Sequence, residues 1–251
     1  MKKSTIIFLV LGLVFAAAII PNILDQSVLI RAENYPLLTR GDEGAEVKKL
    51  QKTLYNLGFK TAGITGIYGL QTEIAVEQFQ RHMDLTVDGL AGKETISTLN
   101  TLSEDKNISE RKIEYAEWNK VDEIFSTEKV VTITDIRTGL SLRVSRIYGT
   151  NHADVEPVSP EDTEVLKNIY GGEWNWERRP IVVEIEDRLL AGSMTGMPHG
   201  ENVNGHINDN NFSGHFDIHF RNSRRHKDNE MDEDHQQMVK KAAEKSWPLT
   251  E

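Results

Sequence analysis

The chain has 251 residues, of which 38% are hydrophobic and 27% are charged, so its composition is that of an ordinary folded protein with one or two domains. Its formal net charge of -10 argues against binding that depends on neutralising phosphates, and we expect no nucleic-acid partner. The absence of cysteine excludes disulfides, thiolate metal ligands and a cysteine nucleophile.

The N-terminus has the pattern of an export signal. Lys2 and Lys3 precede an uninterrupted apolar run over residues 6–20. A run of about 15 residues is typical of a signal-peptide core and is shorter than the ~20 residues that span a bilayer. Residues 1–24 are therefore predicted to be a signal peptide or a signal anchor, with residues 5–20 as the membrane segment in the second case. Both interpretations place the rest of the chain outside the cytoplasm, secreted or anchored at the cell wall.

Three amphipathic helices are predicted after a polar linker at residues 25–36. Apolar residues recur at helical spacing over residues 45–57, 72–82 and 93–102, and glycine-rich turns separate these segments. Short helices with one apolar face each can bury those faces against one another. Residues 37–102 are therefore predicted to form a small helical module with its own core.

The glycine, aromatic and amide positions of this module form a recognisable series. The series includes Arg40-Gly41, Gly66-Ile67-Tyr68-Gly69, Phe79-Gln80, Val87-Asp88-Gly89 and Leu99. It closely resembles the peptidoglycan-binding domain 1 family. The resemblance implies a three-helix module that holds the glycan or the stem peptide of peptidoglycan in a shallow groove and tethers a neighbouring enzyme. Within the module, we predict that Tyr68, Gln80 and Asp88 contact this ligand.

The hydrophobic period changes from helical to alternating near residue 129. Residues 103–128 are predicted to be a helical connector, and residues 129–251 a β-rich domain. The elements expected in this domain are strands over residues 131–134, 140–144, 181–185, 189–191 and 214–220, and helices over residues 160–170 and 232–246. The predicted fold class is therefore α+β, with a three-helix module followed by a β-rich domain.

The histidines of the chain gather in the C-terminal domain, since only His82 of the eight lies outside it. Side chains alternate along a strand, so His215, Asp217 and His219 are expected on one face and the intervening apolar residues on the other. Three titratable groups are costly to bury without a partner or a metal ion. The simpler alternative is a solvated strand face that carries one His–Asp hydrogen bond.

A second resemblance concerns the same strand. His199-Gly200 lies 18 residues before Asp217, which belongs to the run Gly214-His215-Phe216-Asp217-Ile218-His219. This pattern partly resembles the YkuD-type L,D-transpeptidases, which cross-link peptidoglycan stem peptides with a cysteine nucleophile. The resemblance implies catalytic positions at His199, His215 and Asp217. Because Asp217 stands in place of the cysteine, the domain has lost transpeptidation, has acquired another activity, or was altered at this position.

Metal-dependent hydrolysis is an alternative interpretation of this face. Nitrogen and carboxylate ligands suited to zinc are available at His152, Asp154, His215, Asp217 and His219. Two histidines and one carboxylate with an open water position can activate water for amide hydrolysis, although the chain contains no His-Glu-x-x-His motif. Three hypotheses stay open for this peptidoglycan-binding chain: a transpeptidase-like domain, a zinc peptidoglycan hydrolase, and a non-catalytic wall-binding or scaffold protein.

Overall fold

The computed structural model of the chain describes residues 35–105, 109–200 and 207–249. The predicted export signal at residues 1–24 and most of the linker at residues 25–36 lie outside these ranges. Within the described residues, no helix combines the length and the apolar character that a membrane span requires.

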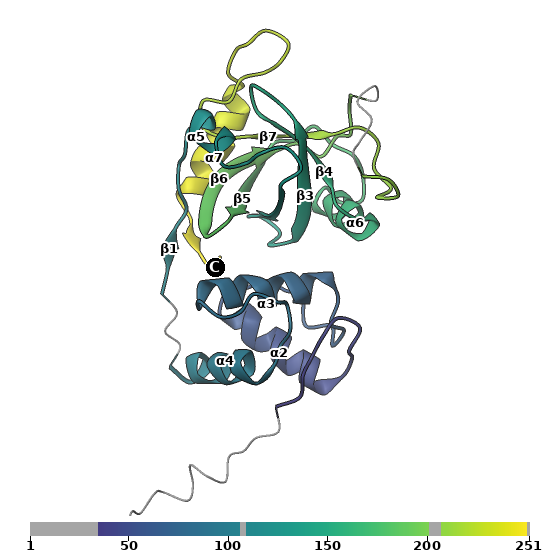
Figure 1. Ribbon diagram of the computed structural model, residues 1–251, viewed down its shortest axis with the longest axis vertical. Coiled ribbons are helices and arrows are strands. Elements are labelled where there is room, and N and C mark those ends of the chain that lie inside the picture. The colour runs from purple at the N-terminus through teal and green to yellow at the C-terminus, as the bar shows by residue number, and fades with distance from the viewer. Residues whose placement is uncertain (1–34, 106–108, 201–206, 250–251) are drawn as a thin grey trace, which may run out of the picture. The chain divides into compact units, whose positions relative to one another are not determined.

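Three helices form the N-terminal part of the described chain (Figure 1). They are α2 (Ala45–Asn56), α3 (Leu70–His82) and α4 (Lys93–Asp105). Their apolar faces meet in a common core that includes the fully buried side chains of Leu54 and Phe79. Gly58 follows α2 with a φ of 90°, a conformation that favours glycine and ends the helix. The predicted helical module is confirmed.

Six antiparallel strands form a closed barrel in the order β2-β3-β4-β7-β6-β5. Their bounds are β2 (Val130–Asp135), β3 (Ser141–Tyr148), β4 (Ala153–Pro157), β5 (Arg179–Ile185), β6 (Arg188–Met194) and β7 (Phe216–His219). In this order β7 lies between β4 and β6, as Figure 1 shows. Together with the helical module, the barrel confirms the predicted α+β class.

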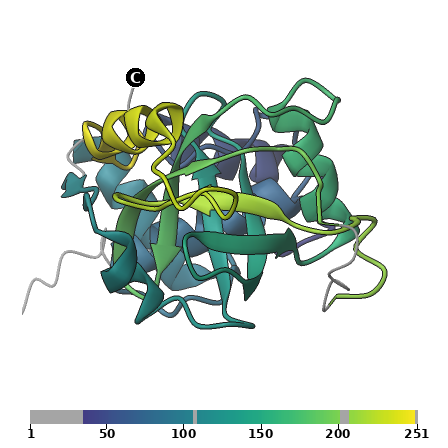
Figure 2. The same cartoon turned by 90° about the horizontal axis from the view of Figure 1, so that it is seen from above.

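Two helices cover different sides of the barrel (Figure 2). Helix α6 (Pro160–Ile169) contacts β3 and β4, whereas α7 (Glu233–Ala243) contacts β5, β6 and β7. Both helices begin at a side-chain cap, because Ser159 accepts from the Asp162 amide and Asp232 accepts from the His235 amide. The cap at Asp232 fixes the first turn of α7, which carries a histidine discussed below.

The predicted helical connector at residues 103–128 is largely wrong. Among its described residues, helix is confined to the end of α4 and to α5 (Trp118–Asp122). Residues Arg111–Lys112 form strand β1, which pairs with β8 (Ser246–Trp247) near the C-terminus. This long-range pairing overrides the local helical pattern, and it also explains why α7 ends at Ala243 instead of continuing to residue 246.

His82, at the end of α3, provides a test of pH-dependent stability. Burial lowers the pKa of His82 from 6.5, and the positive charge of Arg111 lowers it further, against smaller opposing contributions from the Ser109 backbone and Asp84. In the unfolded chain His82 takes up a proton as the pH falls through about 6.5, whereas in the folded chain the residue is still neutral at that pH. The stabilisation that His82 gives the folded chain is therefore fully present above about pH 6.5. It decreases as the pH falls, by at most about 1.4 kcal/mol per pH unit.

Urea unfolding at pH 7.5 and pH 5.5 measures this effect. The difference in unfolding free energy between the two pH values is expected to be smaller for His82→Phe than for the wild type. Phenylalanine cannot take up a proton, and the site already packs an aromatic ring against Phe59. An identical pH dependence in both proteins would contradict the prediction.

Candidate functional site

Histidine and aspartate side chains converge on one face of strands β4 and β7 and on the segments next to them. We call this set the His/Asp cluster, and its members are His152, Asp154, His199, His215, Asp217, His219, His226 and His235. Three overlapping groups of three within it place their ligand atoms within 4.8 Å of one another. The cluster contains six of the eight histidines of the chain.

The register between β4 and β7 builds the centre of the cluster. Asp154 lies directly opposite Asp217, and the neighbouring pair is Ala153 with Ile218. Both members of the neighbouring pair are fully buried in the apolar core, so the two aspartates face away from it together. The alternation expected along residues 214–220 is therefore present.

One histidine contacts both carboxylates. His152 Nε2 is 3.1 Å from Asp154 Oδ1 and 3.2 Å from Asp217 Oδ1. Burial lowers the pKa of His152, but its hydrogen bonds with the two aspartates outweigh burial and raise the pKa to about 10. Like charges directly opposite each other destabilise a sheet, and a positive charge between them offsets that repulsion. His152 therefore links the two carboxylates at the centre of the cluster.

Asp217 has a second histidine partner. His199 Nε2 lies 3.2 Å from the same Asp217 oxygen that His152 contacts. Burial alone would raise the pKa of Asp217, yet the hydrogen bonds from His152 and His199 hold it well below its usual range. Asp217 is therefore an ionised carboxylate at neutral pH and accepts hydrogen bonds or binds a cation.

The deeper histidines of the cluster are neutral. Burial lowers the pKa of His215, holds that of His219 well below its ordinary value, and lowers that of His235 to about 4. The rings of His219 and His235 stack with centroids 3.9 Å apart. Among the described residues, the buried Nδ1 atoms of His215 and His219 have no hydrogen-bond partner. Neutral imidazole with a free nitrogen is the form that binds transition metals.

Backbone carbonyls orient two of the histidines. His152 Nδ1 lies 2.7 Å from the Arg224 carbonyl oxygen, and His199 Nδ1 lies 2.9 Å from that of Met197. A carbonyl oxygen only accepts hydrogen bonds, so Nδ1 carries the proton in both rings and Nε2 faces Asp217. Histidines that bind metals in proteins commonly have such a second hydrogen bond.

Two glycines bring His199 and His215 together. The backbones of these histidines exchange two hydrogen bonds of 2.9 Å, and their ring centroids lie 4.4 Å apart. Gly200 and Gly214 both have positive φ, and a Cβ at Gly200 would overlap the His215 ring, while one at Gly214 would overlap the His199 carbonyl. The His-Gly and Gly-His pairs seen in the sequence thus have a steric cause.

The cluster is open to solvent at one edge. The side chains of His199 and His226 are 28% and 42% exposed, whereas those of His152 and Asp154 are 3% exposed. The exposed ring of Trp176 lies 5.0 Å from that of His199, centroid to centroid. A ligand that reaches the cluster would approach from this edge.

All residues predicted to be catalytic or metal-binding lie in the cluster, and two further members were not predicted. His226 lies within the short basic run at residues 221–227, and such a run is typical of a solvated loop. His226 Nε2 lies 3.3 Å from Asp154 Oδ2. His235 lies on α7, where Ser193 Oγ is 2.8 Å from its Nδ1. The sequence shows that histidines are frequent in the C-terminal domain, but it does not show which of them lie close together in the fold.

The three residues predicted to contact peptidoglycan form hydrogen bonds inside the helical module. Tyr68 is fully buried and its hydroxyl donates to the Gly89 carbonyl at 2.6 Å. The buried Gln80 accepts from the Asp88 and Gly89 amides at 3.0 Å, which fixes the loop after α3. The side chains of Tyr68 and Gln80 are buried in this structure, whereas that of Asp88 is exposed. Contact of the three residues with peptidoglycan stays a prediction, and Asp88 is the one whose side chain is accessible.

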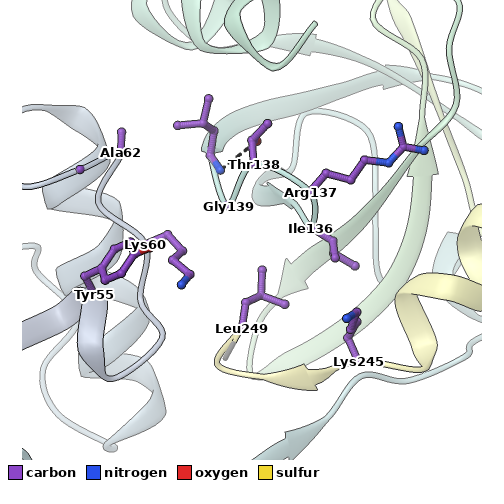
Figure 3. A pocket seen from close by; sticks show the side chains of 11 residues that line it. Tyr55, Lys60, Ala62, Ile136, Arg137, Thr138, Gly139, Lys245 and Leu249 are labelled. Carbon is purple, nitrogen blue, oxygen red and sulfur yellow. Dashed lines mark hydrogen bonds between the residues drawn. The ribbon is translucent and has the colours of Figure 1, made fainter. Parts of the chain in front are cut away.

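A separate cavity of about 650 Å³ contains none of the cluster residues (Figure 3). Tyr55 and Lys60 line it from the segment at and after α2, and Arg137 and Lys245 line it from the barrel domain. Its lining residues include no histidine and no carboxylate. We therefore place the candidate chemistry of the chain at the His/Asp cluster.

Comparison with known proteins identifies the helical module. Residues 43–99 match the family model described as "Putative peptidoglycan binding domain". This segment is a peptidoglycan-binding domain. The resemblance predicted for residues 37–102 is thus confirmed, and the helices α2, α3 and α4 are the elements of this domain.

The peptidoglycan-binding domain is similar to segments of two cell-wall enzymes. The N-acetylmuramoyl-L-alanine amidase CwlM of Mycobacterium tuberculosis is 43% identical over 60 residues, which are 24% of this chain and 15% of that protein. A spore cortex-lytic enzyme of Bacillus cereus is 38% identical over 66 residues, 26% of each protein. The chain thus spans about a quarter or less of the length of these relatives.

One solved structure covers more of the chain. It is the L,D-transpeptidase from Xylanimonas cellulosilytica, which is 22% identical and has a TM-score of 0.27 over 50% of this chain and 59% of that chain.

Proposed function

We propose that this protein is an exported cell-wall protein that binds peptidoglycan and hydrolyses its peptides with a divalent metal ion at the His/Asp cluster. The convergence of five imidazoles and two carboxylates that could hold a metal ion, at and next to β4 and β7, carries this proposal. The peptidoglycan-binding domain supports the choice of polymer, because such a domain keeps an enzyme at its substrate. Export is supported by the sequence pattern at residues 1–24.

The donor set fits a borderline metal such as zinc. Imidazole nitrogen and carboxylate oxygen are its ligands in hydrolases, and the chain supplies both without thiolate. Unpartnered nitrogen atoms are available at Nδ1 of His215 and of His219. Nε2 of His152 and of His199 faces Asp217 and would become a ligand when the metal ion displaces its proton. These features fit a bound cation better than a purely structural ion pair, which would require fewer histidines.

The residues of the cluster have distinct roles under this proposal. A bound divalent cation would polarise the scissile amide carbonyl and lower the pKa of water. Asp154 and Asp217 would supply the carboxylate ligands, and the carbonyls of Met197 and Arg224 hold the histidine rings in place. His199, whose side chain is 28% exposed, would hold the cation through Nε2 where solvent reaches the cluster. The nearby Trp176 offers an exposed face for the substrate.

The proposal is tested by incubating the full chain with purified peptidoglycan and with soluble muropeptides. We expect new peptide termini, detected by mass spectrometry, with added Zn²⁺. Treatment with a chelator is expected to remove the activity, and Zn²⁺ is expected to restore it. If no new termini form with Zn²⁺ or other first-row divalent ions while the chain still binds peptidoglycan, hydrolysis is contradicted and a non-catalytic wall-binding role stands.

A transpeptidase-related site is the second candidate function. The contact that favours it is between His199 and Asp217, because the resemblance places a proton-accepting histidine beside the residue that replaces cysteine. Asp217→Cys is then expected to form a covalent adduct with a carbapenem or an acyl-enzyme with a stem peptide, visible as a mass increase of the intact protein. Asp217→Ser is the matched control, since a hydroxyl is a weaker nucleophile. If the folded cysteine variant forms no adduct, this candidate is excluded.

A further inference from the structure

We infer that the His/Asp cluster binds two divalent metal ions in two adjacent sites. The first site consists of His152, Asp154 and His226, and the second consists of His199, His215 and Asp217. This inference rests on the metal dependence proposed above, and it adds the number of ions and the ligands of each.

The two sites have no residue in common and have the same composition. Each contains two imidazoles and one carboxylate whose ligand atoms all lie within 4.8 Å of one another. The carboxylates come from paired positions on neighbouring strands, Asp154 on β4 and Asp217 on β7. A third grouping, in which His219 joins His152 and Asp217, takes one member from each site. The cluster therefore contains two ligand sets that can be occupied at the same time, whereas the third grouping would compete with both.

Separations between ligand atoms agree with metal coordination. In the first site, Asp154 carboxylate oxygens lie 3.1 Å from His152 Nε2 and 3.3 Å from His226 Nε2. In the second site, Asp217 Oδ1 lies 3.2 Å from His199 Nε2. Bonds of about 2.0–2.1 Å at tetrahedral angles place two ligand atoms roughly 3.3 Å apart. The His–Asp pairs of the first site and the His199–Asp217 pair of the second have this spacing, and the other ligand atoms of each site lie within 4.8 Å.

Each site also contains one histidine that is held from behind. The Arg224 carbonyl fixes the His152 ring in the first site, and the Met197 carbonyl fixes the His199 ring in the second. Such second hydrogen bonds orient ligands and raise their basicity. Each proposed site thus contains one imidazole that is already oriented as a ligand.

Short distances between residues of different sites show that the two sites are adjacent. His152 Nε2 of the first site lies 3.2 Å from Asp217 of the second, and His215 Nε2 of the second lies 4.0 Å from Asp154 of the first. Paired metal ions in hydrolases lie about 3.5–4 Å apart and act on one substrate together. Two divalent ions exceed the charge of two carboxylates, so the centre would favour a substrate that carries carboxylates, as peptidoglycan stem peptides do.

Zinc stoichiometry measured on the full chain tests this inference. After dialysis against Zn²⁺ and removal of the excess, elemental analysis is expected to find two zinc ions per wild-type chain. His226→Ala and His199→Ala are each expected to retain one ion, because each removes a ligand of a different site. Lys227→Ala is the matched control, since it changes the exposed neighbour of His226 in the same loop and is expected to retain two.

Manganese provides an independent measurement. Two adjacent Mn²⁺ ions are expected to give a broadened, exchange-coupled electron paramagnetic resonance spectrum in the wild type and a simple six-line spectrum in His226→Ala. Because His226 lies on an exposed loop, this variant is expected to keep the wild-type circular dichroism spectrum.

The outcomes separate this inference from the proposed function. The two-site assignment would be overturned if the wild-type chain bound only one zinc ion. It would also be overturned if the wild type bound two ions and both His226→Ala and His199→Ala bound none. Either result would leave metal-dependent hydrolysis intact. Absence of bound zinc and manganese would overturn both, and would mean that the cluster is a network of ion pairs.

Discussion

His152→Ala is expected to reduce hydrolysis of muropeptides by at least about 100-fold, the upper range of losses seen when metal-site interactions are removed. His152 Nε2 contacts both Asp154 and Asp217, so its removal takes a ligand from one site and leaves two opposed carboxylates without the group between them. The effect is therefore expected to exceed that of removing His226, which contacts Asp154 and lies on the exposed edge.

Initial rates with soluble muropeptides at saturating Zn²⁺ measure this effect. Binding of the same variant to insoluble peptidoglycan is the internal control, because residues 43–99 are unchanged and the bound fraction is expected to equal that of the wild type. Lys227→Ala is expected to keep the wild-type rate. A folded His152→Ala protein with unchanged hydrolysis would remove the His/Asp cluster from the reaction.

Asp135→Ala is expected to lower the free energy of unfolding by about 3–5 kcal/mol, because it leaves a buried guanidinium without its partner. Asp135, at the end of β2, accepts from Arg179 Nε at 3.0 Å and from Nη2 at 2.7 Å, and both residues are buried. Asp135 also accepts from the Thr138 amide at 2.8 Å, which fixes the turn between β2 and β3. The change thus affects the pairing of β2 with β5 and the β2–β3 hairpin together.

Urea unfolding followed by tryptophan fluorescence measures this loss. Asp228→Ala is the matched control, because Asp228 forms a comparable contact with Arg225 on an exposed loop. Solvent screens that pair, so the control is expected to unfold like the wild type. Equal stabilities for the two variants would contradict the importance assigned to the buried pair.

The helical module could be predicted because its information is local. Val47, Leu50 and Leu54 recur at helical spacing within α2, and all three are buried in the core that this spacing implies. Strand β7 was predictable for the same reason, since alternation along four residues separates Phe216 and Ile218 from Asp217 and His219. In both elements a short stretch of sequence determines which side chains face the apolar core.

The composition of the cluster could not be predicted, because it depends on which strands pair and in what register. Asp154 was a candidate ligand in the sequence, but its position opposite Asp217 results from the pairing of β4 with β7. A shift of one residue in that register would turn one aspartate toward the core. His226 joins the cluster from a loop that has no periodic pattern, so its position depends on tertiary contacts alone.

The place of β7 in the barrel links the assembly of the domain to its chemistry. β7 is the last barrel strand along the chain, and it occupies the gap between β4 and β6. During synthesis, His152 and Asp154 emerge well before the residues that complete either ligand set. Both proposed sites therefore require the closed barrel, so a chain that ends before β7 would carry the peptidoglycan-binding domain without either proposed site.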